Sequence, residues 1–418
     1  MRGRLKTRNL LALTYWSYKD ALVQSAVMPY LRMIRRQLPE GSRIFLFTLE
    51  QSHLSMSEEE ARRERERLEA EEGVRLVAFP YSRFGPRAML RWAGLIPRLW
   101  ALCVRERVAH IHAWCTPAGG AGYILSKLTG APLVLDSYEP HAESMVEVGH
   151  WNEQSPGFRI LFTLERLQTR IARACIATSR GVREYAERKY GVRIERFYVK
   201  PASVDMQLFT PRLAKDPALL RELGLEGKIV CVYAGKIGGI YLEREIFDFF
   251  RAAAARWGER FRVLLLTDAA DERVGALVAA SGLDPATVVK RFVPFRDVPR
   301  HMGLGDFALN PVRPVPTKRY CTSVKDGEYW AMGLPVVIPH DISDDSDIIR
   351  ERRIGAVLDE FTPEAYRRAV EEIDALLAGQ TREELAARVR AVAAEYRDLS
   401  KRWCIYEELY GEGGARGR

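Results

Sequence analysis

Cysteine is scarce in this sequence, and no apolar run is long enough to cross a lipid bilayer. The 418 residues include six cysteines, which are scattered without a CxxC pair and without a nearby histidine at metal-ligand spacing. This pattern argues against a disulfide framework and against a zinc site, and it fits a reducing cytoplasm. No apolar stretch approaches the ~20 residues that a transmembrane helix needs. The patch at 9–16 follows basic residues as in a signal peptide, but polar residues follow it directly, so we interpret it as a first buried strand.

Positive charge exceeds negative charge, with 64 lysines and arginines against 55 aspartates and glutamates and a formal net charge of +9. This excess concerns the partners of the protein and not its fold. The basic residues are spread along the chain with many acids between them. A nucleic-acid surface would cluster them with stacking aromatics, so we expect no nucleic-acid partner. The dense run of mixed charge at 58–72 is interpreted as a solvated helix with ion pairs between residues i and i+4.

Short apolar runs alternate with helical patterns along most of the chain. In the first half the candidate strands are residues 10–15, 43–48, 74–79, 110–112, 132–136 and 174–178. A second series follows a proline-punctuated segment near 200–215 and comprises IVCVYAGK, FRVLLLTD, VVKRFVPF, DFALNP, PVVIP and GAVLDE. This alternation is typical of parallel, doubly wound sheets. We therefore predict an α/β protein of two Rossmann-like domains that face each other across a cleft, with ligands beyond the carboxyl ends of the strands.

The stretch SVKDGEYWAMGLPVVIP at 323–339 places a lysine and a glutamate three residues apart on a short helix. Lys325 stands in the first turn, where the helix dipole disfavours a cation and favours an anion. An anionic ligand such as a phosphate would remove this conflict. Glu328 lies one turn further on the same face, where its carboxylate can accept two hydrogen bonds from a ribose diol. The alternative is a plain surface ion pair between residues i and i+3.

Two helix starts in this half carry acidic or hydroxyl residues that are suited to capping. Thr322 or Ser323 can cap the helix that contains Lys325, and Asp326 is placed like the acid of a capping box. The DSD tripeptide at 345–347 has the DxD form of a known metal-binding motif. It follows a strand and opens a helix, so we interpret its acids as N-capping residues.

A second positively charged loop lies in the same half. The strand IVCVYAG ends before Lys236, and Gly238 and Gly239 follow before a helix that starts near Glu243. Glycines let the backbone approach a diphosphate closely, and Lys236 supplies charge. One glycine loop is weak support, but two strand–helix junctions that each carry a lysine are better. Together they predict a phosphate-binding site in the second half.

These motifs make the C-terminal half similar to the donor-binding domain of retaining glycosyltransferases of family 4, which have the GT-B fold. The family pattern is a strand that ends in Gly-Arg/Lys and a later segment Pro-x-Lys-x-x-Glu-Tyr-x-Ala-x-Gly-x-Pro-Val-Val. The matching segments here are AGK at 234–236 and SVKDGEYWAMGLPVV at 323–337. In the N-terminal half, DALVQSAVMPYL at 20–31 resembles the family's first loop and helix, and HIHAW at 110–114 falls where a strand-end histidine is common. PASVDMQLFTP at 201–211 resembles the interdomain signature.

The resemblance implies a glycosyltransferase that moves a sugar from a nucleotide-diphosphate sugar to a glycan, lipid-linked or other acceptor in polysaccharide or glycoconjugate biosynthesis. It implies retention of configuration, and neither a metal ion nor another cofactor. The two lysines would neutralise the donor diphosphate, and Glu328 would hold the ribose. The implied donor-binding residues are Gly235, Lys236, Gly238, Ser323, Val324, Lys325 and Glu328. The implied acceptor-side residues are Asp20, Gln24, Glu139 and His141, and the catalytic roles fall to His141, Lys236 and Lys325. A purely structural role is the alternative for His141.

The resemblance also implies a division of the chain. Residues 1–205 would form the acceptor-side domain and residues 206–395 the donor-binding domain. Residues 396–410 would form a closing helix that crosses back to the first domain, and the Gly/Arg-rich residues 411–418 are expected to be disordered. The protein would act in the cytoplasm or at the inner membrane face, where an Arg-, Trp- and Leu-rich helix at 87–107 could lie on an anionic membrane surface. That helix could equally pack on the first sheet.

Two positions depart from the family pattern. Tyr320 stands where the family often has the first of two glutamates, and Tyr241 with Leu242 replaces a second lysine after the glycine loop. The lost charge could come from the basic residues that follow Asn310, namely Arg313, Lys318 or Arg319. The missing glutamate leaves a degenerate, non-catalytic partner protein as one alternative. A nucleotide-sugar epimerase of the same fold is another, although the interdomain and first-loop motifs favour transfer.

Overall fold

The computed structural model describes residues 7–82, 86–211 and 215–411. The chain divides into two compact units, which are described separately: unit 1 comprises Met1–Lys200 and Ser400–Arg418, and unit 2 comprises Pro201–Leu399. Apart from Gly411, the tail that was expected to be disordered lies outside the described residues. Among the described helices, none combines the length and the apolar character that a membrane span requires.

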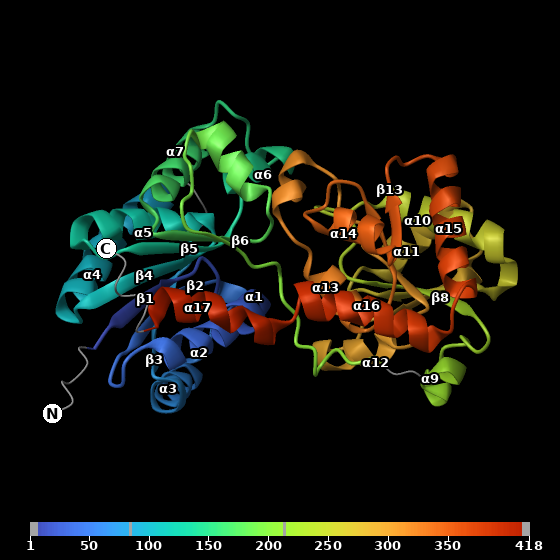
Figure 1. The fold of residues 1–418 in the computed structure, drawn as a ribbon, viewed down its shortest axis with the longest axis horizontal. Coiled ribbons are helices and arrows are strands. Elements are labelled where there is room, and N and C mark those ends of the chain that lie inside the picture. Colours follow the sequence, from blue (N-terminus) through green and yellow to red (C-terminus); the bar gives the residue numbers. More distant parts are fainter. Residues whose placement is uncertain (1–6, 83–85, 212–214, 412–418) are drawn as a thin grey trace. The chain divides into compact units, whose positions relative to one another are not determined.

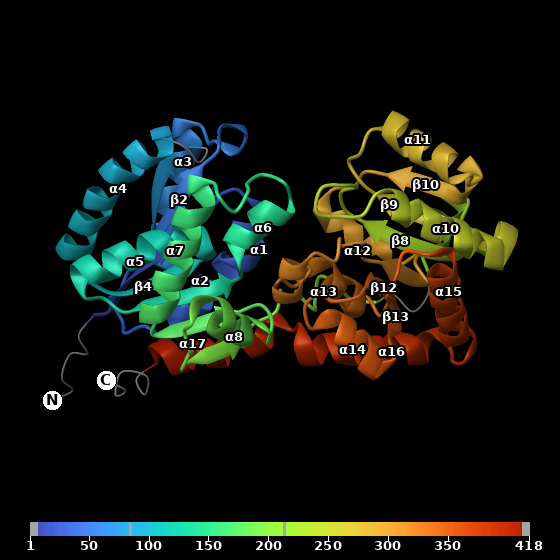
Figure 2. The same ribbon diagram turned by 90° about the horizontal axis from the view of Figure 1, so that it is seen from above.

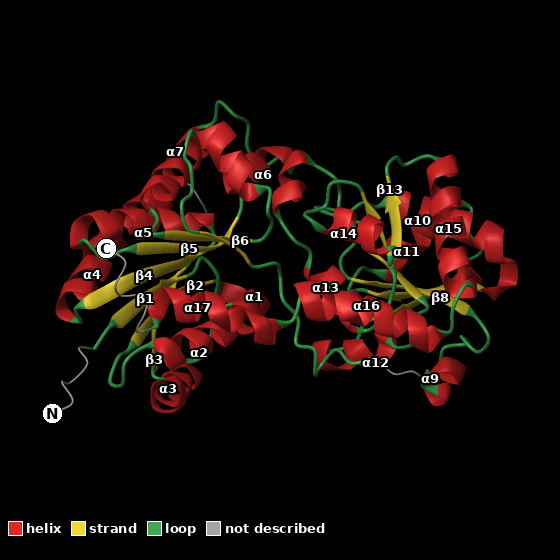
Figure 3. Cartoon of the chain, in the orientation of Figure 1, coloured by secondary structure: helices red, strands yellow, loops and turns green. Residues whose placement is uncertain are grey.

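Unit 1 is built on a seven-stranded parallel sheet with the order β3-β2-β1-β4-β5-β6-β7 (Figure 3). The strands are β1 (Asn9–Leu13), β2 (Ile44–Glu50), β3 (Val74–Pro80), β4 (Val108–Trp114), β5 (Leu133–Tyr138), β6 (Ala174–Ala177) and β7 (Phe197–Val199). The helices are α1 (Ala21–Ala26), α2 (Met28–Gln37), α3 (Glu58–Arg67), α4 (Pro86–Arg105), α5 (Thr116–Thr129), α6 (His141–Glu147), α7 (Pro156–Ile171), α8 (Val182–Tyr185) and α17 (Trp403–Tyr410). Figures 1 and 2 show α5 and α7 side by side along the sheet, while α17 packs on α2.

Unit 2 is built on a six-stranded parallel sheet with the order β10-β9-β8-β11-β12-β13. The strands are β8 (Ile229–Ala234), β9 (Phe261–Leu266), β10 (Val288–Arg291), β11 (Phe307–Leu309), β12 (Val336–Pro339) and β13 (Gly355–Leu358). The helices are α9 (Pro217–Glu222), α10 (Arg244–Trp257), α11 (Asp271–Ser281), α12 (Val298–Met302), α13 (Val324–Ala331), α14 (Asp345–Arg352), α15 (Pro363–Ala378) and α16 (Arg382–Tyr396).

Both faces of the unit 2 sheet are buried, as its continuous apolar strands require. Successive side chains of a strand point to opposite faces. Val230 and Val232 of β8 therefore join the core under α13 and α16, whereas Cys231 and Tyr233 join the core under α10 and α15. Two parallel sheets with helices on both faces confirm the predicted doubly wound α/β architecture. The short strand β7 is an addition that the sequence pattern did not reveal.

The C-terminal segment differs from the single helix expected at 396–410. Tyr396 ends α16, a short 3₁₀ turn covers Leu399–Arg402, and α17 begins at Trp403. The interruption lies at Arg397, whose backbone leaves the helical region (φ −122°, ψ −6°). Its fully buried guanidinium is paired with Asp345. This long-range ion pair fixes where α16 ends. It cannot be predicted from the local periodicity of the sequence.

A fully buried polar network in unit 1 attaches α17 to the sheet. The His112 ring bridges the Tyr410 hydroxyl (Nδ1 to Oη, 2.6 Å) and Asp136 (Nε2 to Oδ2, 3.0 Å). The Asp136 carboxylate also accepts from the Tyr406 hydroxyl at 2.8 Å and pairs with Lys200 at 2.6 Å. Burial alone would raise the pKa of Asp136, but Lys200 and His112 hold it below its usual range. His112 therefore has a structural role, because its partners attach α17 to the sheet.

Candidate functional site

A cavity of about 260 Å³ lies at the carboxyl ends of β8 and β9 in unit 2. Polar and aromatic side chains from four segments line it, together with apolar residues. These include Gly235 and Lys236 after β8, Thr267 and Asp268 after β9, Phe292 and Phe295 after β10, and Glu328 from α13. The carboxyl ends of parallel strands are where ligands of doubly wound sheets bind. The cavity is therefore the candidate site of unit 2.

Helix α13 is packed tightly against the end of β8. The Ala234 amide donates a hydrogen bond to the Tyr329 hydroxyl at 2.9 Å. A Cβ at position 235 would stand 2.4 Å from Lys325 Cε, and Gly235 has a φ of +153°, so the position requires glycine. Gly235 thus serves the approach of α13 as well as the cavity wall.

Lys325 is held by an aromatic residue of the loop after β8. Its ammonium donates to the Tyr241 hydroxyl at 2.7 Å and lies 4.1 Å from the centre of the same ring. Tyr241 is fixed in turn by an antiparallel bridge to Val312. Tyr241, which stands where the family often has a second lysine, therefore holds Lys325. An anion is not needed to stabilise Lys325 in the first turn of α13.

Glu328 reaches the cavity from the second turn of α13. Burial raises the pKa of this carboxyl to about 7, although the charge of Lys325 opposes the shift. Burial favours the neutral form because a carboxylate loses hydration there. Near neutral pH the group is therefore close to the midpoint between its protonated and ionised forms, and partners that donate to it would favour the ionised form.

Lys236 brings a positive charge to the cavity wall from the end of β8. Its side chain is exposed, and its ammonium has no hydrogen-bond or ion-pair partner among the described residues. Gly238 and Gly239 follow with φ values of +79° and +68°, which fold the loop back in a conformation that favours glycine. Lys236 is thus available to a ligand in the cavity.

The predicted capping box of α13 is wrong. Ser323 is the N-cap residue, but its side chain makes no capping hydrogen bond, and Thr322 accepts from the Ala202 amide at 2.8 Å. Asp326 is fully buried and accepts from Asn310 Nδ2 at 2.7 Å. Burial and the nearby Asp345 carboxyl raise the pKa of Asp326 well above its usual range. Asp326 therefore anchors the buried side of α13.

The acids of the DSD tripeptide do not cap α14 as predicted. Asp344 is the N-cap residue and makes no side-chain capping bond. Asp345 is buried against Arg397, and Asp347 pairs with Arg319 at 2.7 Å. Arg319 also donates to the Ser343 carbonyl at 2.8 Å. This arginine, which was one candidate for the missing charge, is therefore committed to the α14 segment.

The donor-site prediction is only partly reflected in the cavity lining. Gly235, Lys236 and Glu328 line the cavity, and Lys325 lies behind Gly235. The other predicted donor residues do not line it: Gly238, Ser323 and Val324. The sequence reading missed Thr267 and Asp268, although two polar residues directly after a buried strand are a usable signal. The lining also includes the aromatic rings of Phe292 and Phe295 after β10.

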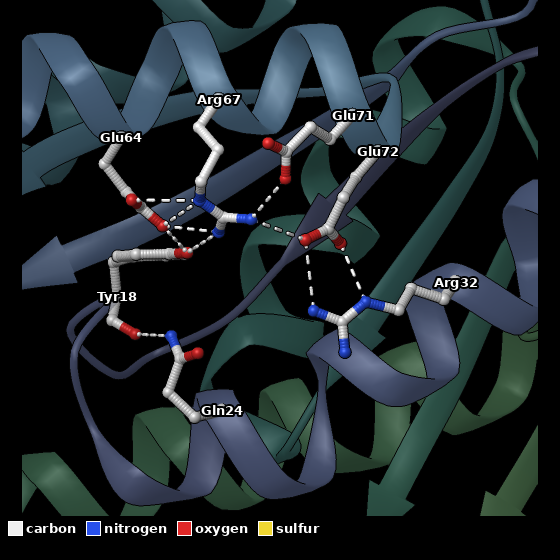
Figure 4. Close-up of polar contacts among 7 residues, drawn as sticks. All are labelled: Tyr18, Gln24, Arg32, Glu64, Arg67, Glu71 and Glu72. Atoms are coloured by element: carbon white, nitrogen blue, oxygen red, sulfur yellow. Dashed lines mark hydrogen bonds and ion pairs between the residues drawn. The ribbon is translucent and has the colours of Figure 1, made fainter.

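In unit 1, polar contacts hold the loop that precedes α1 (Figure 4). The Tyr18 hydroxyl donates to Glu64 Oε1 at 2.6 Å, and Gln24 Nε2 donates to the Tyr18 carbonyl at 2.6 Å. Arg67 bridges Glu64 and Glu72. The charged run at 58–72 does carry the expected helical ion pairs, but it also braces this loop. Gln24, expected on the acceptor side, uses its amide to shape the loop.

The other residues expected on the acceptor side follow the carboxyl ends of β1 and β5. Asp20 accepts from the Leu22 amide at 2.9 Å and so caps α1. The Glu139 carbonyl accepts from Thr116 at 2.6 Å. His141 begins α6, and its backbone amide donates to the buried carboxyl group of Glu165 at 3.0 Å. Because β1 and β5 both adjoin β4, these loops lie at one edge of the sheet.

Comparisons with known proteins agree with this geometry. Residues 27–203 match the model of the glycosyl transferase 4-like domain. Anabaena HepE in complex with UDP is a structural match at 15% identity, with a TM-score of 0.70 over 96% of this chain and 99% of that chain. Sucrose-phosphate synthase from Thermosynechococcus elongatus matches at 14% identity, with a TM-score of 0.71 over 98% and 100%. WaaG, a glycosyltransferase involved in lipopolysaccharide biosynthesis, matches at 13% identity, with a TM-score of 0.66 over 97% and 100%. No curated protein matches the sequence.

The comparisons define the fold of the chain and the class of one of its domains. Residues 27–203 are a glycosyl transferase 4-like domain. The whole chain has the GT-B fold, which confirms the fold that the motifs predicted.

Proposed function

We propose that this protein is a glycosyltransferase that takes a hexosyl group from a UDP-hexose and transfers it with retention of configuration. The observation that carries the proposal is the cavity of unit 2, where Lys236 and Glu328 come together from distant parts of the sequence at the strand ends. It is supported by structures of HepE, a protein of the same fold, in complex with UDP and with UDP-glucose.

Each cavity residue has a chemical role in this scheme. The Lys236 ammonium would bind the diphosphate, and Lys325 would reach it after exchanging its hydrogen bond with Tyr241. Both charges would stabilise the nucleoside diphosphate as it leaves, which is electrostatic catalysis without a metal ion. Ionised Glu328 would accept from the ribose hydroxyls. The exposed rings of Phe292 and Phe295 would pack on the base.

The acceptor-side residues of unit 1 remain part of the proposal. Asp20, Glu139 and His141 follow the carboxyl ends of β1 and β5, which flank β4, and would contact a glycan or lipid-linked acceptor, while Gln24 shapes the loop of Asp20. His141 would orient the acceptor or the sugar. A lipid-linked acceptor would place the protein in the cytoplasm at the inner membrane face, with its basic charge favouring anionic lipid.

The first experiment is a thermal-shift titration with UDP, GDP, ADP, CMP and TDP in the presence of EDTA. A ligand that binds only the folded state raises the apparent stability in proportion to the logarithm of its concentration. We expect selective stabilisation by UDP, lost in Lys325→Ala and Glu328→Ala. The exposed α16 residue Glu383 offers a matched control, and Glu383→Ala should keep the shift.

Absence of a shift with every nucleotide would refute the donor site. Release of UDP from UDP-hexose that depends on an added acceptor would support transfer. Conversion of the sugar without an acceptor would instead identify an epimerase of the same fold.

A further inference from the structure

Unit 1 contains a concave site at the amino ends of its strands. The acceptor-side loops described above lie at the opposite, carboxyl ends. A cavity of about 800 Å³ lies where β5, β6 and β7 begin. Arg173 and Arg196 stand directly before β6 and β7, and the Cys175 amide donates to the Arg196 carbonyl at 2.9 Å. The two strand starts that carry these arginines are thus hydrogen-bonded to each other.

Four arginines line this cavity: Arg170, Arg173, Arg193 and Arg196. Among the described residues, Glu195 also lines the cavity, and Glu408 pairs with Arg196 at 2.9 Å. Over these six named groups, four guanidinium groups and two carboxylates sum to two positive charges.

Two of these arginines lack partners in the part of the chain that the structure describes. Arg170 and Arg193 are exposed and make neither an ion pair nor a side-chain hydrogen bond with a described residue. Arg170 stands in the last turn of α7, where a cation complements the helix dipole. Arg193 follows the helical segment that ends at Tyr190 by three residues, outside its last turn, and Arg196 lies on the approach to β7, so that explanation does not extend to them.

We propose that this arginine cavity binds a phosphate group carrying two negative charges, either on a soluble phosphorylated compound or on a lipid headgroup. Guanidinium groups bind phosphate oxygens in a bidentate manner, and a dianion would match the two excess charges. The site is separate from the donor cavity of unit 2 and does not depend on the proposed donor chemistry. It would give the protein a second anionic ligand, held at the amino ends of strands.

The test uses pyrophosphate as the soluble probe and phosphatidylcholine vesicles with or without phosphatidic acid as the lipid probe. Calorimetric titration at low salt should show pyrophosphate binding, or sedimentation should show binding only to vesicles that contain phosphatidic acid. Arg170→Gln combined with Arg193→Gln should weaken that binding about tenfold or more, because each loses charge-assisted hydrogen bonds. Pyrophosphate binding would identify a soluble ligand, and vesicle binding alone would identify a headgroup.

Two control variants make the result decisive. Arg159→Gln with Arg62→Gln removes the same charge from exposed positions on α7 and α3, and it should leave binding unchanged. Lys236→Ala with Lys325→Ala removes the candidate donor site. Binding lost only in the lysine variant, lost equally in both arginine pairs, or absent from the wild type with both probes would overturn the proposal.

Discussion

Glu328→Gln separates the energetic cost of burying this carboxyl group from its proposed use in binding. Burial raises the pKa of Glu328 from the ordinary 4.5 to about 7. That difference corresponds to about 3 kcal/mol. The folded chain binds the proton more tightly than the unfolded chain, so the free energy of unfolding falls as pH rises from about 4.5 to 7. Above that range the full cost of ionising Glu328 is present.

Glutamine has a similar shape and no charge, so it avoids this cost. We expect Glu328→Gln to unfold at higher urea concentration than the wild type. The gain in the free energy of unfolding should grow from about 1 kcal/mol at pH 5 to about 3 kcal/mol at pH 8.5. UDP binding should change in the opposite direction, weakening about tenfold or more as charge-assisted hydrogen bonds to the ribose are lost.

Urea unfolding followed by fluorescence at the two pH values measures the first effect, and calorimetry measures the second. Glu383→Gln, an exposed exchange on α16, controls for the loss of one negative charge. The reasoning fails if Glu328→Gln shows no pH-dependent gain in stability. A gain in stability with unchanged UDP affinity would leave the burial argument intact but would exclude Glu328 from the ribose.

Three further exchanges test separate contacts. Tyr241→Phe keeps a ring beside Lys325 but removes the tyrosine hydroxyl. We expect the protein to stay folded and its UDP affinity, measured by calorimetry, to change. Unchanged affinity would mean that the hydroxyl does not position the lysine. Asp136→Asn should lower the free energy of unfolding of unit 1 by about 3–5 kcal/mol, because Lys200 loses its buried counter-charge; a change under 1 kcal/mol in urea would contradict this. Phe292→Ala should weaken UDP binding about tenfold with little change in melting temperature, since the ring is 74% exposed; equal affinity would exclude base packing.

The sheets could be predicted from the sequence because the apolar pattern of each strand indicates how that strand is buried. A strand such as β8 is apolar along its whole length, which indicates a parallel sheet buried on both faces. The edge strand β7 (Phe197–Val199) is only three residues long and half-buried, so it carries no comparable pattern. The glycine loop is also a local feature, because Gly235 and Lys236 come directly after the end of β8.

The acids near α13 and α14 show where local patterns are insufficient. Asp326 and Asp345 stand at sequence positions that capping residues commonly occupy, yet both are buried. What distinguishes them is the amide of Asn310 and the guanidinium of Arg397, which come from other parts of the chain. A capping acid and a buried anchoring acid look alike until such partners are placed, so the sequence could not separate them.

Lys325 is a second case in which the structure changes what the sequence pattern indicates. The position of Lys325 in a first helical turn predicts an anionic ligand. In the structure, however, Tyr241 already supplies a hydrogen bond and an aromatic face. Its position therefore no longer argues for a diphosphate. The donor proposal depends instead on Lys236, which has no partner in the described residues, and on Glu328, whose burial costs stability. A carboxyl group kept at an energetic cost beside an available cation is better explained by a ligand than by the fold.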